Sequence, residues 1–277
     1  MTSPLTPRLA ILGKYWKLFD LGLQNTFVYR WNFLLRMVFG IVPLIGAVFL
    51  WQAVFRGREG GIEGYDFPAM IFYFLLVVFL ENLITPTEDE WQIAAEIRDG
   101  RISAYLTKPL NYLAYRFCTY ASYRLLYFGV VLVPILILAY VFRAYIVLPA
   151  NVLTWPAFLI STIMAALIQF LMAYSLALIS FWVLEVSTII FIHYAFEYFL
   201  SGQVFPLDMM PRWLQGFLLW SPFTYELFFP VQIAMERVHG AALVRGLAIQ
   251  AGWVLLMWLC AHWLWARGIR KYQAVGG

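Results

Sequence analysis

The feature that most constrains this chain is a series of long apolar runs separated by short polar connections. A bilayer-spanning helix needs about 20 mostly apolar residues, within a range of about 17–25, and six stretches of the sequence reach that length. Six spans would place both ends of the chain on the same side of a membrane. The predicted spans are Met37 to Phe55, Phe67 to Ile84, Leu125 to Phe142, Trp155 to Val183, Ser187 to Phe205 and Leu247 to Trp265.

The composition fits a chain whose main solvent is lipid. Hydrophobic residues make up 63% of the 277 residues and charged residues 12%, whereas soluble domains are about 45–50% apolar. The net charge of +4 comes from basic residues beside the apolar runs, not from a separate basic stripe, which argues against a nucleic-acid partner. We therefore expect residues 1–277 to form one all-α integral membrane domain embedded in a bilayer.

The distribution of basic residues predicts the orientation. Lys and Arg accumulate in the short cytoplasmic segments of membrane proteins. With the N-terminus inside, 13 of the 19 Lys and Arg residues fall in cytoplasmic segments. Both termini are therefore predicted to be cytoplasmic.

Residues 8–31, before the first span, are predicted to form an interfacial amphipathic helix. Apolar residues recur there at helical spacing from Leu12 to Phe27, while Lys14 and Lys17 fall on another face. Trp, Tyr and Lys side chains suit the headgroup layer. A disordered tail is the alternative.

A charged segment, residues 85–124, separates the second and third predicted spans. Its run TPTEDEWQIAAEIRD has a candidate N-cap at Thr87, followed by three acidic residues that suit a helix N-terminus. Gly100 can end this helix, and Pro109 can stop the apolar stripe that follows. The segment is either a solvated loop on the headgroups or a docking element for a soluble partner, on which alternating charges would fix the register.

The connection over residues 203–246 is irregular. Its apolar pieces are shorter than a span and are interrupted by prolines. Non-helical backbone at membrane depth occurs only where protein or a water-filled cavity satisfies its polar groups. We expect short re-entrant or outer-leaflet helices packed on the bundle before the last span.

An ionisable pair, His193 and Glu197, lies one helical turn apart in the fifth predicted span. A charge near mid-membrane costs about 2.5–3.5 kcal/mol or more, so it should face the interior and find a partner. The pair is either a hydrogen bond that holds a helix interface or part of a substrate path or proton-sensitive site. Gln169 is interpreted as an interhelical contact, and Glu81 as a helix-end charge near the headgroups.

Motifs for catalysis are missing from the sequence. It has no GxxxxGK[ST] phosphate loop, no HExxH and no GxSxG. Its two cysteines and three histidines have no metal-ligand spacing. We therefore expect a non-enzymatic chain with no metal and no cofactor of its own.

Two stretches resemble the membrane subunit of a type-2 ABC exporter, in the branch of daunorubicin-resistance-like permeases. IRDGRISAYLTKPL is similar to the family pattern I-x-x-G-x-I/L-x-x-x-L-x-x-P-L, and LSGQVFPLDMMPRWLQGFLLWSPFTY is similar to the family's outer motif. The matching residues are Ile97, Gly100, Ile102, Leu106, Pro109 and Leu110 in the first stretch, and Ser201, Gly202, Phe205, Pro206, Pro211, Trp213, Ser221 and Pro222 in the second.

The resemblance implies a coupling helix in the first cytoplasmic loop. It also implies two permease subunits, identical or related, resting on two separate ATPase subunits that bind ATP and Mg, in a bacterial plasma (inner) membrane. The ATPase-coupling candidates are Glu96, Arg98, Asp99, Gly100, Arg101, Leu106, Lys108 and Pro109.

The first functional hypothesis is thus a permease that exports an amphiphile or polymer with ATP energy supplied by another chain. The alternative is a proton-coupled secondary transporter that uses His193 and Glu197 as a relay, and a third hypothesis is a membrane scaffold or membrane-embedded enzyme. No residue pattern selects the substrate, or a homodimer over a heterodimer, and export as the direction rests on the resemblance alone.

Overall fold

The computed structural model describes residues 13, 16–20, 30–57, 60–85 and 89–272. The predicted interfacial helix lies largely outside this part of the chain. Residues 16–20 are helical, and the exposed Trp16 stacks on Phe19. The described residues form helices and no named strand, which confirms the all-α class.

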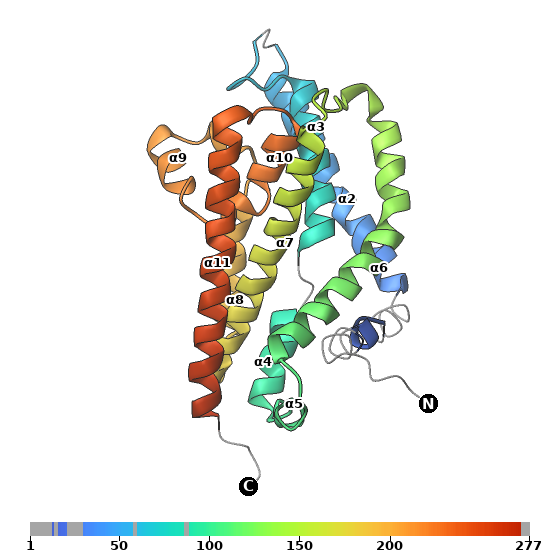
Figure 1. The fold of residues 1–277 in the computed structure, drawn as a ribbon. Helices are drawn as coiled ribbons and strands as arrows, with labels where there is room; N and C mark the ends of the chain where they lie inside the picture. Colours follow the sequence, from blue (N-terminus) through green and yellow to red (C-terminus); the bar gives the residue numbers. More distant parts are fainter. Residues whose placement is uncertain (1–12, 14–15, 21–29, 58–59, 86–88, 273–277) are drawn as a thin grey trace, which may run out of the picture.

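The helices run alternately between two ends of an elongated bundle (Figure 1). The α9 end carries residues 56–57, 60–66, 142–153 and 201–239, and the α5 end carries residues 89–111 and 179–186 together with Tyr272. Four short 3-10 turns, η1 to η4, cover Arg143–Tyr145, Ile179–Phe181, Leu207–Met209 and Phe223–Tyr225. The α-helices are α2 (Arg30–Phe55), α3 (Phe67–Ile84), α4 (Asp89–Arg98), α5 (Ser103–Leu106), α6 (Tyr112–Val141), α7 (Thr154–Leu178), α8 (Ser187–Leu200), α9 (Arg212–Leu218), α10 (Phe228–Ala234) and α11 (Gly240–Lys271).

Three segments of the described chain are long and apolar enough to cross a membrane, namely Phe67–Arg98, Thr154–Phe181 and Gly240–Lys271. The two halves of the bent α6 add a fourth when they are counted as one span. These segments overlap four of the six predicted spans. The total of six spans stays a prediction.

The fifth predicted span is shorter than its hydropathy indicates. α8 has 14 residues and reaches about 21 Å at 1.5 Å per residue, less than the ~30 Å hydrocarbon core. It ends before Gly202, whose φ of 88° lies in the left-handed region that favours glycine. A Cβ at Gly202 would stand 2.6 Å from the Tyr73 hydroxyl oxygen, so this turn requires glycine.

The third predicted span begins earlier than its hydropathy indicates. α6 starts at Tyr112, capped by the side chain of Asn111, inside the segment predicted as a loop. Arg116 and Arg124 lower the apparent hydropathy of this first half, but both side chains are buried against other helices. The predicted loop over residues 85–124 therefore includes three turns of α6.

α7 occupies the centre of the bundle and packs along α11, α4 and α10 (Figure 1). Small residues such as Ser161 and Ala165 on its buried face allow close approach of its neighbours. Gln250 of α11 is fully buried, and its amide donates to the carbonyls of Ser161 and Tyr225, each at 2.9 Å. Its own carbonyl accepts from the Ser161 hydroxyl at 2.9 Å.

Substitutions at two glycines of α11 test this packing. A Cβ at Gly246 would overlap the ring of Phe229 in α10, whereas a Cβ at Gly252 meets nothing within 4 Å. We expect Gly246→Ala to lower the free energy of unfolding by about 1–3 kcal/mol through overpacking. Gly252→Ala should leave it unchanged or raise it by up to ~1 kcal/mol, because alanine favours helix.

Reversible denaturation of both variants in mild detergent measures the difference. Equal stability of the two variants would contradict the close approach of α10 to α11.

Candidate functional site

The charged segment folds into an elbow made of α4 and α5. The turn between them is at Gly100, which has a φ of 75°, and the Ile102 amide closes it by donating to the Glu96 carbonyl at 3.0 Å. Ile93, Ile97 and Ile102 are buried together with aromatic residues of α7. One face of the elbow is thus anchored in the bundle.

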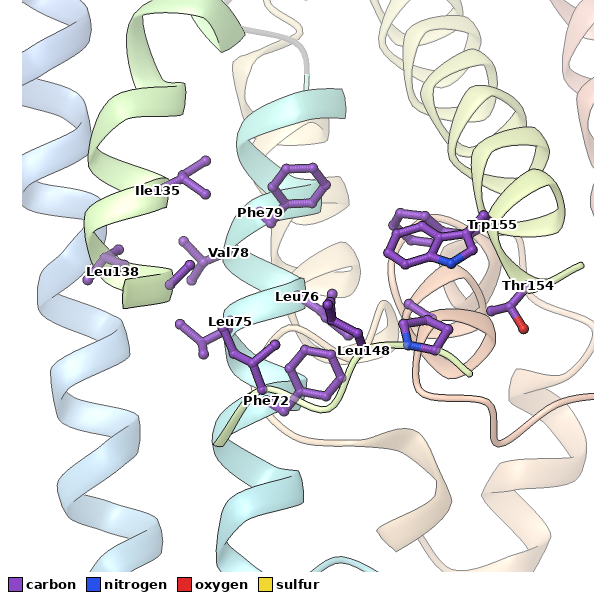
Figure 2. Close-up of a pocket in the computed structure, with 15 residues that line it drawn as sticks. Phe72, Leu75, Leu76, Val78, Phe79, Ile135, Leu138, Leu148, Thr154 and Trp155 are labelled. Atoms are coloured by element: carbon purple, nitrogen blue, oxygen red, sulfur yellow. The ribbon is translucent and has the colours of Figure 1, made fainter. Parts of the chain in front are cut away.

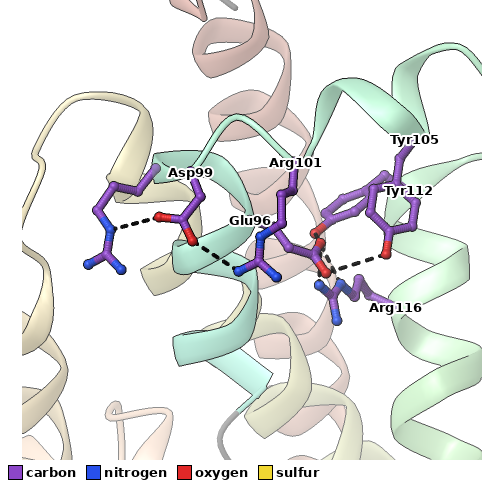
Figure 3. A network of polar contacts seen from close by, with 7 residues as sticks. Glu96, Asp99, Arg101, Tyr105, Tyr112 and Arg116 are labelled. Carbon is purple, nitrogen blue, oxygen red and sulfur yellow. Dashed lines mark hydrogen bonds and ion pairs between the residues drawn. The ribbon is translucent and has the colours of Figure 1, made fainter. Parts of the chain in front are cut away.

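The other face of the elbow carries an exposed charged triad, Arg98, Asp99 and Arg101 (Figure 3). The Asp99 carboxylate accepts from Arg98 Nε at 3.2 Å and from Arg101 Nη2 at 3.0 Å. The hydrogen bond from Arg98, followed by that from Arg101, lowers the pKa of the Asp99 carboxyl. The triad therefore presents two guanidinium groups whose directions are set by one carboxylate that stays ionised at neutral pH.

Glu96 points the opposite way, into the bundle (Figure 3). It forms an ion pair with Arg116 of α6, whose side chain is only 4% exposed, and accepts from the Tyr112 hydroxyl at 2.8 Å. Tyr105 also donates to it, at 3.4 Å. Glu96, one of the eight coupling candidates, therefore connects the elbow to α6 inside the bundle.

The remaining candidates lie on the outer side of the elbow or in its turn. Leu106, Lys108 and Pro109 are exposed, and the Lys108 ammonium lies 5.5 Å from the centre of the Tyr105 ring. Gly100 shapes the turn with its backbone.

Tyr272, directly after α11, makes a second contact with the elbow. This contact was not predicted from the sequence. Its hydroxyl donates to the Gly100 carbonyl at 2.9 Å and lies 2.7 Å from the Ser103 hydroxyl oxygen. Lone tyrosines give no sequence signal for such a contact. The elbow is therefore held by α6 and α11 as well as by α7.

The buried ion pair should dominate the stability of the elbow. Glu96→Gln leaves Arg116 buried without a counter-charge, and we expect a loss of about 3 kcal/mol in unfolding free energy, the low end for broken buried pairs. Asp99→Asn, which removes two exposed ion pairs, should change little. Denaturation in mild detergent compares the two variants, and a larger loss for Asp99→Asn would contradict the assignment.

Inside the bundle, the predicted polar pair lies together as its spacing indicates. His193 Nε2 is 3.5 Å from a Glu197 carboxylate oxygen. Gln169 of α7 donates its amide to the other oxygen of Glu197 at 2.8 Å, which links α7 to α8.

Two further glutamates join this pair and were missed as members of the site. Glu90 of α4 and Glu226, just after η4, are each only 1% exposed. Glu90 accepts a hydrogen bond from Tyr194, and Glu226 lines the same cavity as Gln169 and Glu197. The polar residues that line this small polar cavity are Thr85, Glu90, Gln169, His193, Tyr194, Glu197 and Glu226.

Glu81, interpreted from the sequence as a helix-end charge near the headgroups, is half-buried in the bundle. It lies one turn before the end of α3, close to Gln203 and Arg124. Its negative charge is close enough to interact with that of Glu197. Carboxylates from four separate segments thus converge in an apolar protein.

Metal chemistry has no support among the described residues. They contain no group of three or more His, Cys, Asp or Glu side chains placed to hold an ion. Cys118 and Cys260 are free thiols.

The outer-motif residues build turns at the α9 end. The Ser201 carbonyl accepts from the Phe228 amide at 2.9 Å, and the Gly202 carbonyl accepts from the Tyr73 hydroxyl at 2.6 Å. Pro206, Pro211 and Pro222 precede η3, α9 and η4, respectively. Phe205 packs beside the core next to α3, whereas Trp213 is exposed.

These features define a multi-pass membrane protein with an anchored, charged elbow at one end. The chain matches the model of the ABC-2 family transporter proteins over residues 41–276 and belongs to that family. Such chains are generally the non-catalytic membrane component of a transporter and work with an ATPase partner. A comparison with curated proteins gives no match.

Proposed function

We propose that the chain is the transmembrane permease of an ATP-driven exporter in the daunorubicin-resistance-like branch, and that a separate ATPase subunit docks on the charged triad. The observation that carries the proposal is the division of the elbow into two faces. Arg98 and Arg101 are exposed, while the isoleucines on the opposite face are buried.

The contacts of the elbow with α6, α7 and α11 support a mechanical role. A displacement of α4 would reach α6 through Glu96 and Arg116, and α11 through Tyr272. α7 would move with both, because it packs on α4 and α11. The elbow can therefore transmit ATP-driven motion of a docked subunit into the membrane helices without binding nucleotide itself.

The proposed assembly has two permease subunits, identical or related, and two ATPase subunits that hold ATP and Mg. The elbow then faces the cytoplasm of a bacterial cell, at the inner membrane. The exported substrate is an amphiphile or a polymer.

Charge reversal tests the docking surface. In Arg98→Glu/Arg101→Glu, repulsion should reduce co-purification of the ATPase about tenfold, which corresponds to ~1.4 kcal/mol. Arg143→Glu, at the α9 end, is the matched control and should retain the ATPase. Affinity purification in mild detergent, with mass spectrometry and an ATP-hydrolysis assay, gives the readout.

Thermal unfolding of the same preparations shows that the variants are folded. Wild-type levels of ATPase binding and stimulation in the double variant would refute docking at the triad.

The buried carboxylates favour a second candidate, a proton-coupled secondary transporter with His193 and Glu197 as the relay. The two proposals differ in their energy source. Under the first, Glu197→Gln keeps the hydrogen bond to Gln169 and should leave ATP hydrolysis by the reconstituted complex within about twofold of wild type.

A protonophore should have equally little effect on that complex. If no ATPase accompanies the chain and its activity collapses with the proton gradient, the secondary transporter is the correct assignment.

A further inference from the structure

An apolar cavity of about 250 Å³ lies near the α9 end, between α3, the second half of α6 and the start of α7 (Figure 2). Phe72 and Phe79 lie five and twelve residues from the first residue of α3, or about 7.5 and 18 Å along its axis. The cavity is therefore at the depth of lipid tails in the leaflet at the α9 end. Its connecting-loop wall is formed by Ile146, Leu148 and Pro149.

The bend of α6 accounts for the space. α6 turns by 45° between its halves Tyr112–Val130 and Leu132–Val141. Pro134 lies four residues after Val130, so its ring displaces the Val130 carbonyl and removes one helical hydrogen bond. The bend leaves Ile135 and Leu138 on one side of the cavity and Trp155 of α7 on the other (Figure 2).

Water is a poor occupant of this cavity. A buried water needs two to four polar partners, and the lining residues offer two polar side-chain groups, the Thr154 hydroxyl and the Trp155 indole N–H. The Thr154 hydroxyl already donates to Glu236 at 3.1 Å, so few polar partners remain for a water. An empty space of this size would forfeit the dispersion contacts of all the side chains around it.

Hydrocarbon, by contrast, has a route into the cavity. Leu148 and Trp155 line it and are also exposed on the bundle surface. The neighbouring Val133 and Leu136 of α6 are exposed apolar residues as well. The lining is therefore continuous with a surface that faces lipid in a membrane.

We propose that this cavity binds one acyl chain of a phospholipid from the leaflet at the α9 end. The chain lies between α3 and the bent half of α6 and fills the gap made by Pro134. Its headgroup remains at the level of the connecting loop. The site is independent of the docking surface and of the polar cavity.

Photo-crosslinking tests the proposal on the full chain in nanodiscs. The probe is phosphatidylglycerol with a diazirine near the end of one acyl chain, and adducts are located by peptide mass spectrometry. When unlabelled lipid is added for increasing times before irradiation, we expect labelling at Phe72 and Phe79 to persist about tenfold longer than labelling at Leu136.

A matched pair of variants on α6 provides the control. Leu138→Trp fills the cavity and should reduce adducts at Phe72 and Phe79 about tenfold, whereas Leu136→Trp, at a position 58% exposed to the bundle surface, should not. Equal persistence at cavity and surface positions in the wild-type chain would overturn the proposal, and this result needs no variant to fold. Unchanged labelling in a folded Leu138→Trp variant would also overturn it.

Discussion

The side-chain amide of Gln250, buried inside the bundle, makes three hydrogen bonds that hold α11 against α7 and η4. A buried amide without partners is costly, so these bonds fix the rotation of α11 about its axis. That rotation turns Gly246 toward Phe229 at the α9 end and brings Tyr272 to the elbow at the α5 end. The positions of both ends of α11 follow from this contact, ten residues after the start of the helix.

The elbow depends on the same arrangement. Its isoleucines pack on α7, and its internal carboxylate, Glu96, pairs with Arg116 of α6. Because the buried face is held at several points, the exposed triad has a defined position relative to the bundle. Rigid attachment of this kind is what a protein needs if force applied at its surface is to reach membrane helices.

Hydropathy predicted most of the helices and failed where burial and charge compete. The bounds of α3 agree with the prediction, because Asp66 caps its start and its sequence is apolar throughout. The first turns of α6 were assigned to a loop, because Arg116 and Arg124 count as loop charges although both are buried. The end of α8 was placed too late, because Val204 and Phe205 are apolar although the backbone already turns at Gly202.

The candidate site was predictable in its local part only. The spacing of His193 and Glu197 indicated their contact, and the alternating charges indicated an exposed helix. The convergence of Glu90 and Glu226 depends on tertiary packing between segments far apart in the sequence, which no local pattern encodes. For the same reason, the sequence alone does not tell that Glu96 points into the bundle and Arg98 away from it. That difference depends on how the elbow packs against α6.

The position of Tyr272 has a practical consequence for handling the protein. Its hydroxyl lies within one hydrogen bond of the Gly100 turn, beside the charged triad. A bulky tag or fluorescent protein fused soon after this residue would start next to the elbow and compete for space with anything that approaches it. The α9 end, where α9 protrudes from the bundle with Trp213 exposed (Figure 1), can carry a label without crowding that surface.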